Sequence, residues 1–273
     1  MFRLHWCLRP VAISLSVMFF AVVLAGCSAR ESAFEPDKTS ATTTTTKADQ
    51  PAIAKVPDAD RDKVPDSSDL CPNKAEDSRW SAGTDGCPDT VDDLVAFATS
   101  DIDTFWESVF AAEGERYVSP RRVAAYTGRE RTGCGASLPG NAFYCANDNS
   151  IYYDESLIED VFNSNGDFAP VFVIAHEWGH LVQQHLGILS NPRRQNIQNE
   201  LQADCFAGFY TQDAESRKLL EAGDVDEAKM MAIAAGDPAG TRRNSGDAHG
   251  TSKQRVAAFQ SGYTGGLKAC LAI

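Results

Sequence analysis

The chain has 273 residues, of which 43% are hydrophobic and 23% are charged, and its formal net charge is −13 at pH 7. This composition is typical of a globular protein and excludes a collagen-like chain, a wholly disordered chain and a multi-pass membrane protein. The excess of acidic residues also excludes a nucleic-acid-binding protein, because such a protein needs a basic surface.

Residues 1–26 are expected to be a secretory signal peptide. Arg3 and Arg9 precede an apolar stretch at residues 11–24, which is too short for a membrane-spanning helix of about 20 apolar residues. The stretch ends in the sequence Leu-Ala-Gly-Cys, which resembles a bacterial lipobox, so Cys27 would become the lipidated first residue of the mature chain. An ordinary signal peptide would instead leave Cys27 as a free thiol. We expect a palmitate-bearing lipoprotein that is anchored in the cell membrane and faces the extracytoplasmic side.

A polar segment and an acidic segment follow the signal peptide. Residues 27–57 include a run of threonines and few apolar side chains, so we expect a disordered tether. Residues 58–89 are short, acidic and contain two cysteines. Five aspartates of this segment fit positions 1, 3, 5, 9 and 12 of a calcium-binding loop, namely Asp58, Asp60, Asp62, Asp66 and Asp69.

The acidic segment is similar to a thrombospondin type 3 repeat, with two departures. Lys63 stands where the sharp turn of a calcium loop uses glycine, and Asp69 replaces the usual bidentate glutamate. Two explanations therefore stay open for residues 58–89. One is a weak calcium site of the extracellular type, and the other is a solvated acidic linker that is closed by a disulfide.

Residues 90–273 are expected to form one helix-rich domain. Apolar residues recur at helical spacing from Val91 to Phe110, and Thr90 with Asp93 predicts a capping box at the start of this helix. Further helices are expected at about residues 168–186, 195–212, 224–235 and 251–261. Residues 150–154 predict a strand, which is either an edge that pairs with an extended peptide or an interior part of a sheet. The predicted fold class is therefore α+β, with a small sheet.

The cysteines support export and predict three disulfides. Of the eight cysteines, Cys7 leaves with the signal peptide and Cys27 is expected to carry lipid, so six remain, and six cysteines allow fifteen pairings. Short spacing for two pairs, and elimination for the third, predict the following disulfides: Cys71–Cys87, Cys134–Cys145 and Cys205–Cys270. Such bonds persist in exported proteins.

The segment from His176 to His180 matches the pattern H-E-x-x-H and lies within the expected helix at 168–186. Histidines four residues apart project from one face of a helix, so both rings can bind one Zn²⁺. Glu177 lies one step round the helix, where it can contact a zinc-bound water without binding the metal. A histidine pair that is merely buried and hydrogen-bonded would give the same pentapeptide, so the zinc interpretation needs a further ligand.

The next expected helix supplies that ligand. A catalytic zinc takes three protein ligands, and Glu200 can be the third. Asp204 lies one turn further along the same face and can accept a hydrogen bond from a ligating imidazole. Taken alone, Glu200 and Asp204 could simply lie on a solvent-exposed face of their helix. Because the preceding helix carries H-E-x-x-H, we expect them to belong to a metal site instead.

A stabilising donor for the oxyanion of the transition state is also expected. His249 is the first candidate and Tyr210 the second. The alternative is that His249 merely caps or orients the helix that begins near Thr251.

Six stretches of the chain carry a resemblance to a known family: Cys134-Gly135, Phe143-Tyr144-Cys145, Ile151-Tyr152-Tyr153-Asp154, Val173-Ile174-Ala175-His176-Glu177, Glu200-Leu201-Gln202-Ala203-Asp204-Cys205-Phe206-Ala207-Gly208 and His249-Gly250-Thr251-Ser252-Lys253-Gln254-Arg255. H-E-x-x-H followed by N-E-x-x-x-D resembles the gluzincin arrangement of thermolysin-type peptidases. More specifically, residues from about 90 to 270 resemble the bacterial "putative neutral zinc metallopeptidase" family. The resemblance implies a zincin-like domain with Zn²⁺ at His176, His180 and Glu200, and it implies no particular substrate.

The expected function is hydrolysis of peptide bonds in a peptide or protein substrate by a membrane-tethered zinc metallopeptidase. A zinc-activated water would attack the peptide bond, and Glu177 would act as the general base. One alternative is a catalytically inactive lipoprotein that uses the same scaffold to bind or adhere to a partner. Another is a calcium-dependent spacer or adhesion protein in which residues 58–89 matter most. Glu177 favours the peptidase, because a protein that only binds has no need of a general base.

Overall fold

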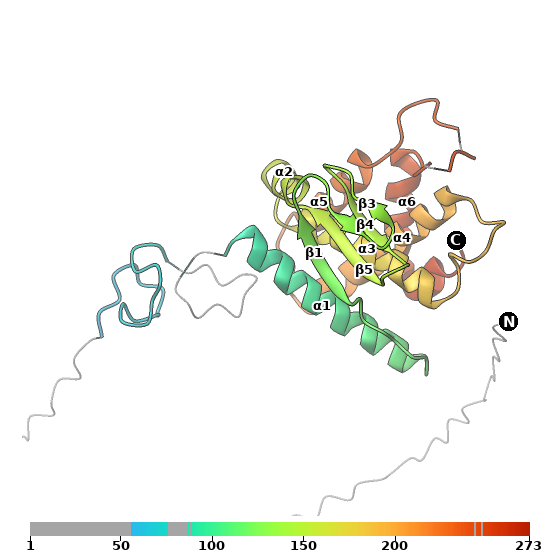
Figure 1. Ribbon diagram of the computed structural model, residues 1–273. Coiled ribbons are helices and arrows are strands. Elements are labelled where there is room, and N and C mark those ends of the chain that lie inside the picture. The colour runs from blue at the N-terminus through green and yellow to red at the C-terminus, as the bar shows by residue number, and fades with distance from the viewer. Residues whose placement is uncertain (1–55, 76–86, 88, 243, 247) are drawn as a thin grey trace, which may run out of the picture. The chain divides into compact units, whose positions relative to one another are not determined.

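The computed structural model describes residues 56–75, 87, 89–242, 244–246 and 248–273 (Figure 1). The expected signal peptide, the expected lipidation site and the expected tether up to residue 55 lie outside these residues. None of the described helices has both the length and the apolar character that crossing a membrane requires.

Helices dominate the described part of the chain after residue 89. The elements in chain order are α1 (Val91–Ala112), β1 (Arg122–Tyr126), β2 (Arg131–Thr132), β3 (Gly135–Ala136), β4 (Ala142–Cys145), β5 (Ser150–Asp154), α2 (Glu155–Asn165), α3 (Phe168–His185), α4 (Asn196–Ser216), α5 (Asp224–Ala234) and α6 (Ser252–Cys270). The predicted α+β class, rich in helix and with a small sheet, is confirmed.

The predicted helices are present; α4 ends four residues later than expected and α6 nine residues later. α1 begins at the predicted capping box, in which the Asp93 N–H donates to Thr90 Oγ1 over 3.2 Å and the Thr90 N–H donates to Asp93 Oδ2 over 2.8 Å. α6 continues past its predicted end to Cys270, with a kink at Gly266. Its glycine-rich second half weakened the helical pattern, but packing against α4 overrides that weak propensity.

The sheet has the strand order β1-β5-β4, with β1 parallel and β4 antiparallel to β5. Because β5 lies between two partners and is fully buried, it is an interior strand and not the edge that one interpretation of the sequence allowed. The two edge strands of this sheet are β1 and β4. The strands β1 to β4 and the helix α2 were not predicted. α2 follows β5 directly, and Asp154 caps it by accepting the Ser156 N–H over 2.9 Å.

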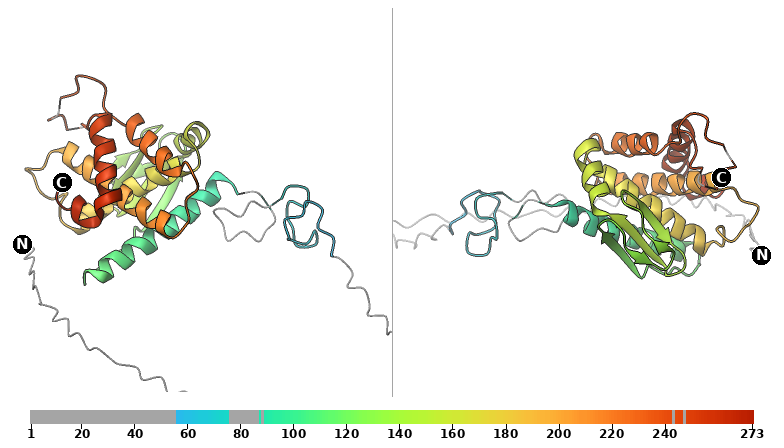
Figure 2. Two further views of the ribbon diagram at one scale, coloured as in Figure 1. Left: turned by 180° about the vertical axis from the view of Figure 1, so that it is seen from behind. Right: turned by 45° about the horizontal axis from the view of Figure 1, so that its top comes forward.

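α3 lies between the sheet and the helices α5 and α6 (Figure 2). Fourteen of its eighteen residues are buried, which explains why it is apolar on every side. A polar side chain in such a helix is costly unless a partner satisfies it. The buried polar residues His176, Glu177 and Gln183 of α3 therefore mark the part of the helix where function is expected.

α4 and α6 pack at very short distance because glycines face the partner backbone. A Cβ atom at Gly262 would lie 1.8 Å from the carbonyl oxygen of Cys205, and one at Gly208 would lie 2.1 Å from that of Phe259. Any larger side chain at either position would push the two helices apart. A disulfide also joins this helix pair. The described residues hold three disulfides, all with the predicted pairing: Cys71–Cys87, Cys134–Cys145 and Cys205–Cys270.

Replacing Cys205 and Cys270 together by alanine is expected to lower the free energy of unfolding by about 4 kcal/mol. The bond closes a separation of 65 residues and therefore restricts the unfolded chain strongly. Urea unfolding of the wild type and the double variant measures the difference. The matched control is loss of the Cys134–Cys145 bond, which closes 11 residues and should cost about 3 kcal/mol. Unchanged stability of the Cys205/Cys270 variant would contradict this role.

Candidate metal centre

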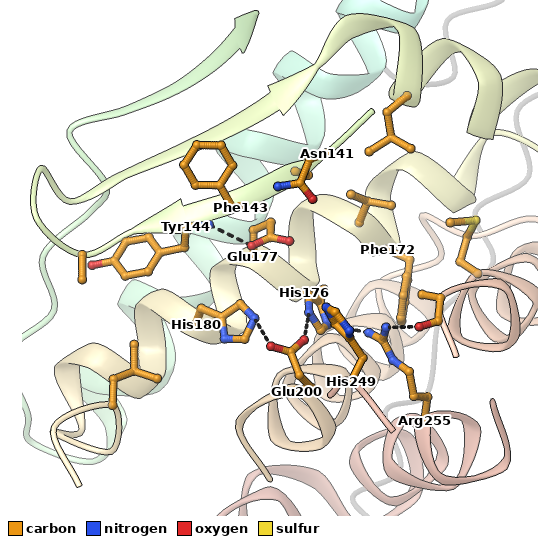
Figure 3. A pocket seen from close by; sticks show the side chains of 17 residues that line it. Asn141, Phe143, Tyr144, Phe172, His176, Glu177, His180, Glu200, His249 and Arg255 are labelled. Atoms are coloured by element: carbon orange, nitrogen blue, oxygen red, sulfur yellow. Dashed lines mark hydrogen bonds and ion pairs between the residues drawn. The ribbon is translucent and has the colours of Figure 1, made fainter. Parts of the chain in front are cut away.

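Two helices bring the three predicted metal ligands together. α3 presents His176 and His180, and α4 presents Glu200 (Figure 3). Nε2 of His176 lies 3.2 Å from Glu200 Oε2, and Nε2 of His180 lies 3.6 Å from Glu200 Oε1. One ligand atom from each residue lies within 4.8 Å of the other two. The cluster therefore offers two imidazole nitrogens and a carboxylate to a single ion.

Each imidazole of the cluster is oriented by a hydrogen bond at Nδ1. Nδ1 of His176 lies 2.9 Å from Asp204 Oδ1, and Nδ1 of His180 lies 3.0 Å from Gln183 Oε1. These acceptors leave Nε2 of both rings directed toward Glu200. The contact of Asp204 is the one expected from the sequence. Gln183 was not predicted, although its place three residues after His180 on one helix face was an available signal.

Asp204 is paired in turn with Arg255 of α6. Arg255 Nη2 donates to Asp204 Oδ1 over 2.6 Å, and Arg255 Nε donates to Asp204 Oδ2 over 2.7 Å. Both side chains are buried. No role was predicted for Arg255, because the contact depends on how two helices pack. Its only signal in the sequence is membership of the motif that begins at His249.

The electrostatics of the cluster favour positive charge. Burial lowers the pKa of His176, but hydrogen bonds with Asp204 and Glu200 outweigh burial and raise this pKa to about 10. The pKa of His180 is raised as well, because the contact with Glu200 outweighs burial. Burial acts to raise the pKa of Glu200, yet its contacts with the two histidines hold this pKa well below its usual range. The surroundings of the two histidines and Glu200 therefore favour a positive charge at the cluster.

Charge and donor chemistry both fit a zinc ion. The site holds three buried carboxylates, those of Glu177, Glu200 and Asp204, and Arg255 is the one buried arginine of the described residues. A divalent cation would balance the remaining negative charge. Imidazole nitrogen with carboxylate oxygen is a donor set that Zn²⁺ uses, whereas Ca²⁺ and Mg²⁺ prefer oxygen ligands alone.

Glu177 lies beside the ligand cluster, between α3 and the edge strand β4. Its Oε2 accepts the backbone N–H of Tyr144 over 2.8 Å, and the side chain is buried (Figure 3). A cavity of about 580 Å³ opens in front of it. The ligand cluster, residues 142–144 of β4 and the apolar side chains of Phe172 and Met231 line this cavity. A carboxylate is therefore held next to the metal ligands and within reach of a molecule in the cavity.

The two candidates for oxyanion stabilisation lie in different places. His249 lines the cavity, its side chain is 48% exposed, and its Nδ1 lies 3.5 Å from Asp237 Oδ1. Capping of α6 does not explain His249, because Thr251 is the N-cap of that helix. Tyr210 is a wrong candidate. It is buried in the core, and its hydroxyl donates to Asp101 Oδ2 over 2.8 Å away from the cavity lining.

The acidic segment brings three of its five aspartates together. Asp58, Asp60 and Asp62 each place one carboxylate oxygen within 4.8 Å of the others. All five aspartates accept backbone N–H groups, and those to Asp66 and Asp69 measure 2.8 Å and 2.7 Å. The local loop is therefore folded around a group of carboxylates, and calcium binding by this group stays a prediction.

Comparison with known proteins gives one family and several relatives. The family model described as "Putative neutral zinc metallopeptidase" matches residues 59–272. The uncharacterized protein YpfJ of Escherichia coli strain K12 is 39% identical over 184 residues, which cover 59% of this chain and 63% of that protein. The uncharacterized protein Rv2575 of Mycobacterium tuberculosis strain H37Rv is 31% identical over 193 residues, which cover 60% and 64% respectively. The chain thus spans less than two thirds of the length of these relatives. No solved structure matches it.

Proposed function

The chain belongs to the family described as "Putative neutral zinc metallopeptidase", and from this premise we propose that it hydrolyses peptide bonds in a zinc-dependent reaction. One observation carries the proposal: His176, His180 and Glu200 converge on one point. Glu177 lies beside them at the cavity. Zn²⁺ held by these three residues would polarise the scissile carbonyl group and lower the pKa of water.

Glu177 is the general base of the proposed reaction. Its carboxylate accepts a proton from the attacking water and then delivers that proton to the leaving amine. The hydrogen bond from the Tyr144 N–H fixes one carboxylate oxygen, so the other oxygen is left for this proton transfer. Substrate therefore has to enter the cavity between β4 and α3.

The edge strand β4 is the proposed docking site for an extended peptide. The Tyr144 N–H points away from β5, toward Glu177. In an antiparallel pair alternate residues direct their backbone groups to the same side, so the groups of Ala142 also face the free edge. A peptide that adds to this edge as a further strand would pass in front of Glu177.

His249 is the proposed donor to the oxyanion. It lies on the cavity wall. Its backbone N–H donates to Asp237 Oδ2 over 3.0 Å, and this hydrogen bond anchors the loop that carries His249. The ring can turn toward the cavity because the side chain is only half buried.

A cleavage screen separates this proposal from an inactive scaffold that only binds. The mature full-length protein, loaded with zinc, is incubated with a pool of proteome-derived peptides, and mass spectrometry identifies new termini. We expect cleavage that a chelator abolishes and added zinc restores. A protein that holds zinc but generates no new termini would instead be a binding or adhesion lipoprotein.

We further propose that the enzyme is held at the cell membrane on its extracytoplasmic side by lipid on Cys27. The support is the short signal-like stretch that ends in Leu-Ala-Gly-Cys. The mass of the N-terminal peptide of the mature chain tests this, because an unmodified Cys27 would remove the anchor.

Weak calcium binding by the acidic segment is a second proposed property. Within residues 56–75 and 87, Oδ2 of Asp60 and Oδ2 of Asp69 are buried without a hydrogen-bond partner. Lys63, at the position expected for glycine, takes a φ of 82° and so makes the required turn at some cost in strain. Calorimetric titration should show millimolar affinity in the wild type and none in Asp60→Ala. Absence of heat in both proteins would leave only an acidic linker.

A further inference from the structure

A buried ion pair joins Asp204 of α4 to Arg255 of α6, whose side chain also lines the cavity (Figure 3). Asp204 of α4 is fully buried, and both of its oxygens accept a hydrogen bond from Arg255. Its Oδ1 also faces Nδ1 of His176 at 2.9 Å. One carboxylate thus joins a guanidinium on α6 to a metal ligand on α3.

Arg255 is itself held in a fixed position. Its Nη1 donates to the carbonyl oxygen of Ala235, the residue that caps the C-terminal end of α5, over 2.9 Å. The side chain of Arg255 is only 4% exposed. α6, which carries it, is locked on α4 by the close approach at Gly208 and Gly262. The direction of the guanidinium is therefore set by three helices.

We propose that Arg255 is a positioning residue of the metal centre: it holds the Asp204 carboxylate in the orientation that accepts a hydrogen bond from Nδ1–H of His176 and so leaves Nε2 of His176 for the metal. This inference rests on the proposed zinc site. It assigns to α6, which carries no predicted ligand, a direct part in building that site.

To hold the Asp204 carboxylate in one orientation, Arg255 has to contact both of its oxygens. A guanidinium donates in parallel to both oxygens of a carboxylate and so fixes the plane of the carboxylate, whereas an ammonium group is a point charge that fixes only a distance. Nη2 of Arg255 also lies 3.3 Å from His176 Nδ1, so the guanidinium blocks that side of the ring. His180 has no such pair and is oriented by the neutral Gln183, whose Nε2 donates to the Asn199 carbonyl oxygen over 2.7 Å.

The test compares two arginine-to-lysine variants of the mature full-length protein. Arg255→Lys keeps the positive charge but loses the planar guanidinium that contacts both oxygens of Asp204. Arg217→Lys is the matched control, because Arg217 also forms a two-pronged pair, with Asp101, but does not line the cavity. Competition with a chromophoric chelator measures zinc affinity, and the visible spectrum of the Co²⁺-loaded protein reports the ligand geometry.

We expect Arg255→Lys to bind zinc 10–100-fold more weakly and to show a shifted Co²⁺ spectrum, as is typical when an outer partner of a metal ligand is lost. Arg217→Lys should match the wild type in both measurements. If Arg255→Lys does not fold, the double variant Asp204→Asn/Arg255→Gln removes both buried charges together and should show the same loss of affinity.

Wild-type affinity and an unchanged Co²⁺ spectrum in Arg255→Lys would overturn the inference and leave the proposed function intact. An equal loss in both lysine variants would also overturn it, because the effect would then be general destabilisation. A wild-type protein that binds no zinc would overturn the proposed function itself, together with this inference.

Discussion

Replacing Glu177 by glutamine is expected to lower kcat/KM for peptide hydrolysis by about 10²–10⁴-fold, which is the range that general acid–base catalysis supplies. Glutamine has the same shape and keeps an oxygen that can accept the Tyr144 N–H, so the fold and the cavity should persist. It cannot take a proton from water. The measurement is hydrolysis of a peptide from the cleavage screen, with zinc content determined on the same sample.

Glu159→Gln is the matched control for this variant, because Glu159 is an exposed glutamate of α2 that does not line the cavity. It should retain wild-type activity. Near-wild-type hydrolysis by Glu177→Gln would remove Glu177 as the base and would favour a different catalytic group.

Glu200→Ala is expected to weaken zinc binding by more than the 10–100-fold that loss of an outer partner costs. Only His176 and His180 would remain as ligands, and the carboxylate that lies 3.2 Å and 3.6 Å from their Nε2 atoms would be gone. Competition with a chelator measures the affinity, and elemental analysis after gel filtration gives the zinc content.

Glu177→Gln serves as the comparison for Glu200→Ala, because it removes a carboxylate of the same cavity that is not a proposed ligand. It should keep one equivalent of zinc. If Glu200→Ala bound zinc as tightly as the wild type, the third ligand would have to be another residue.

The local part of the site was predictable because helix geometry alone determines it. Two histidines four residues apart must share a face of α3, whatever surrounds the helix. Glu200 and Asp204 also share a face of α4, but only the packing of α4 against α3 brings them to the histidines. The expectation for these two residues therefore depended on the combined pattern of the two helices.

The residues that were not predicted act through tertiary contacts. Arg255 reaches Asp204 only because α6 packs tightly on α4, and that contact depends on Gly208 and Gly262. Tyr210 fits an active-site residue by type, yet its direction on α4 places it in the core with Asp101. Residue type and helical spacing do not contain this information.

The sheet was the least predictable part of the fold. β5 was found because its apolar residues are consecutive, but whether such a strand is interior or at an edge depends on its partners. Most residues of β1 and β4 are only partly buried, so neither strand carries a clear alternating pattern. Pairing with the buried β5 is what forms them.

The most direct test of zinc-dependent hydrolysis is a titration of the metal-free protein with zinc while peptide cleavage is measured. We expect no cleavage before zinc is added and a rise that reaches its maximum at one equivalent, with no rise in Glu177→Gln. Full cleavage by the metal-free protein, or a zinc-loaded wild type that cleaves no peptide of the pool, would contradict the proposed function.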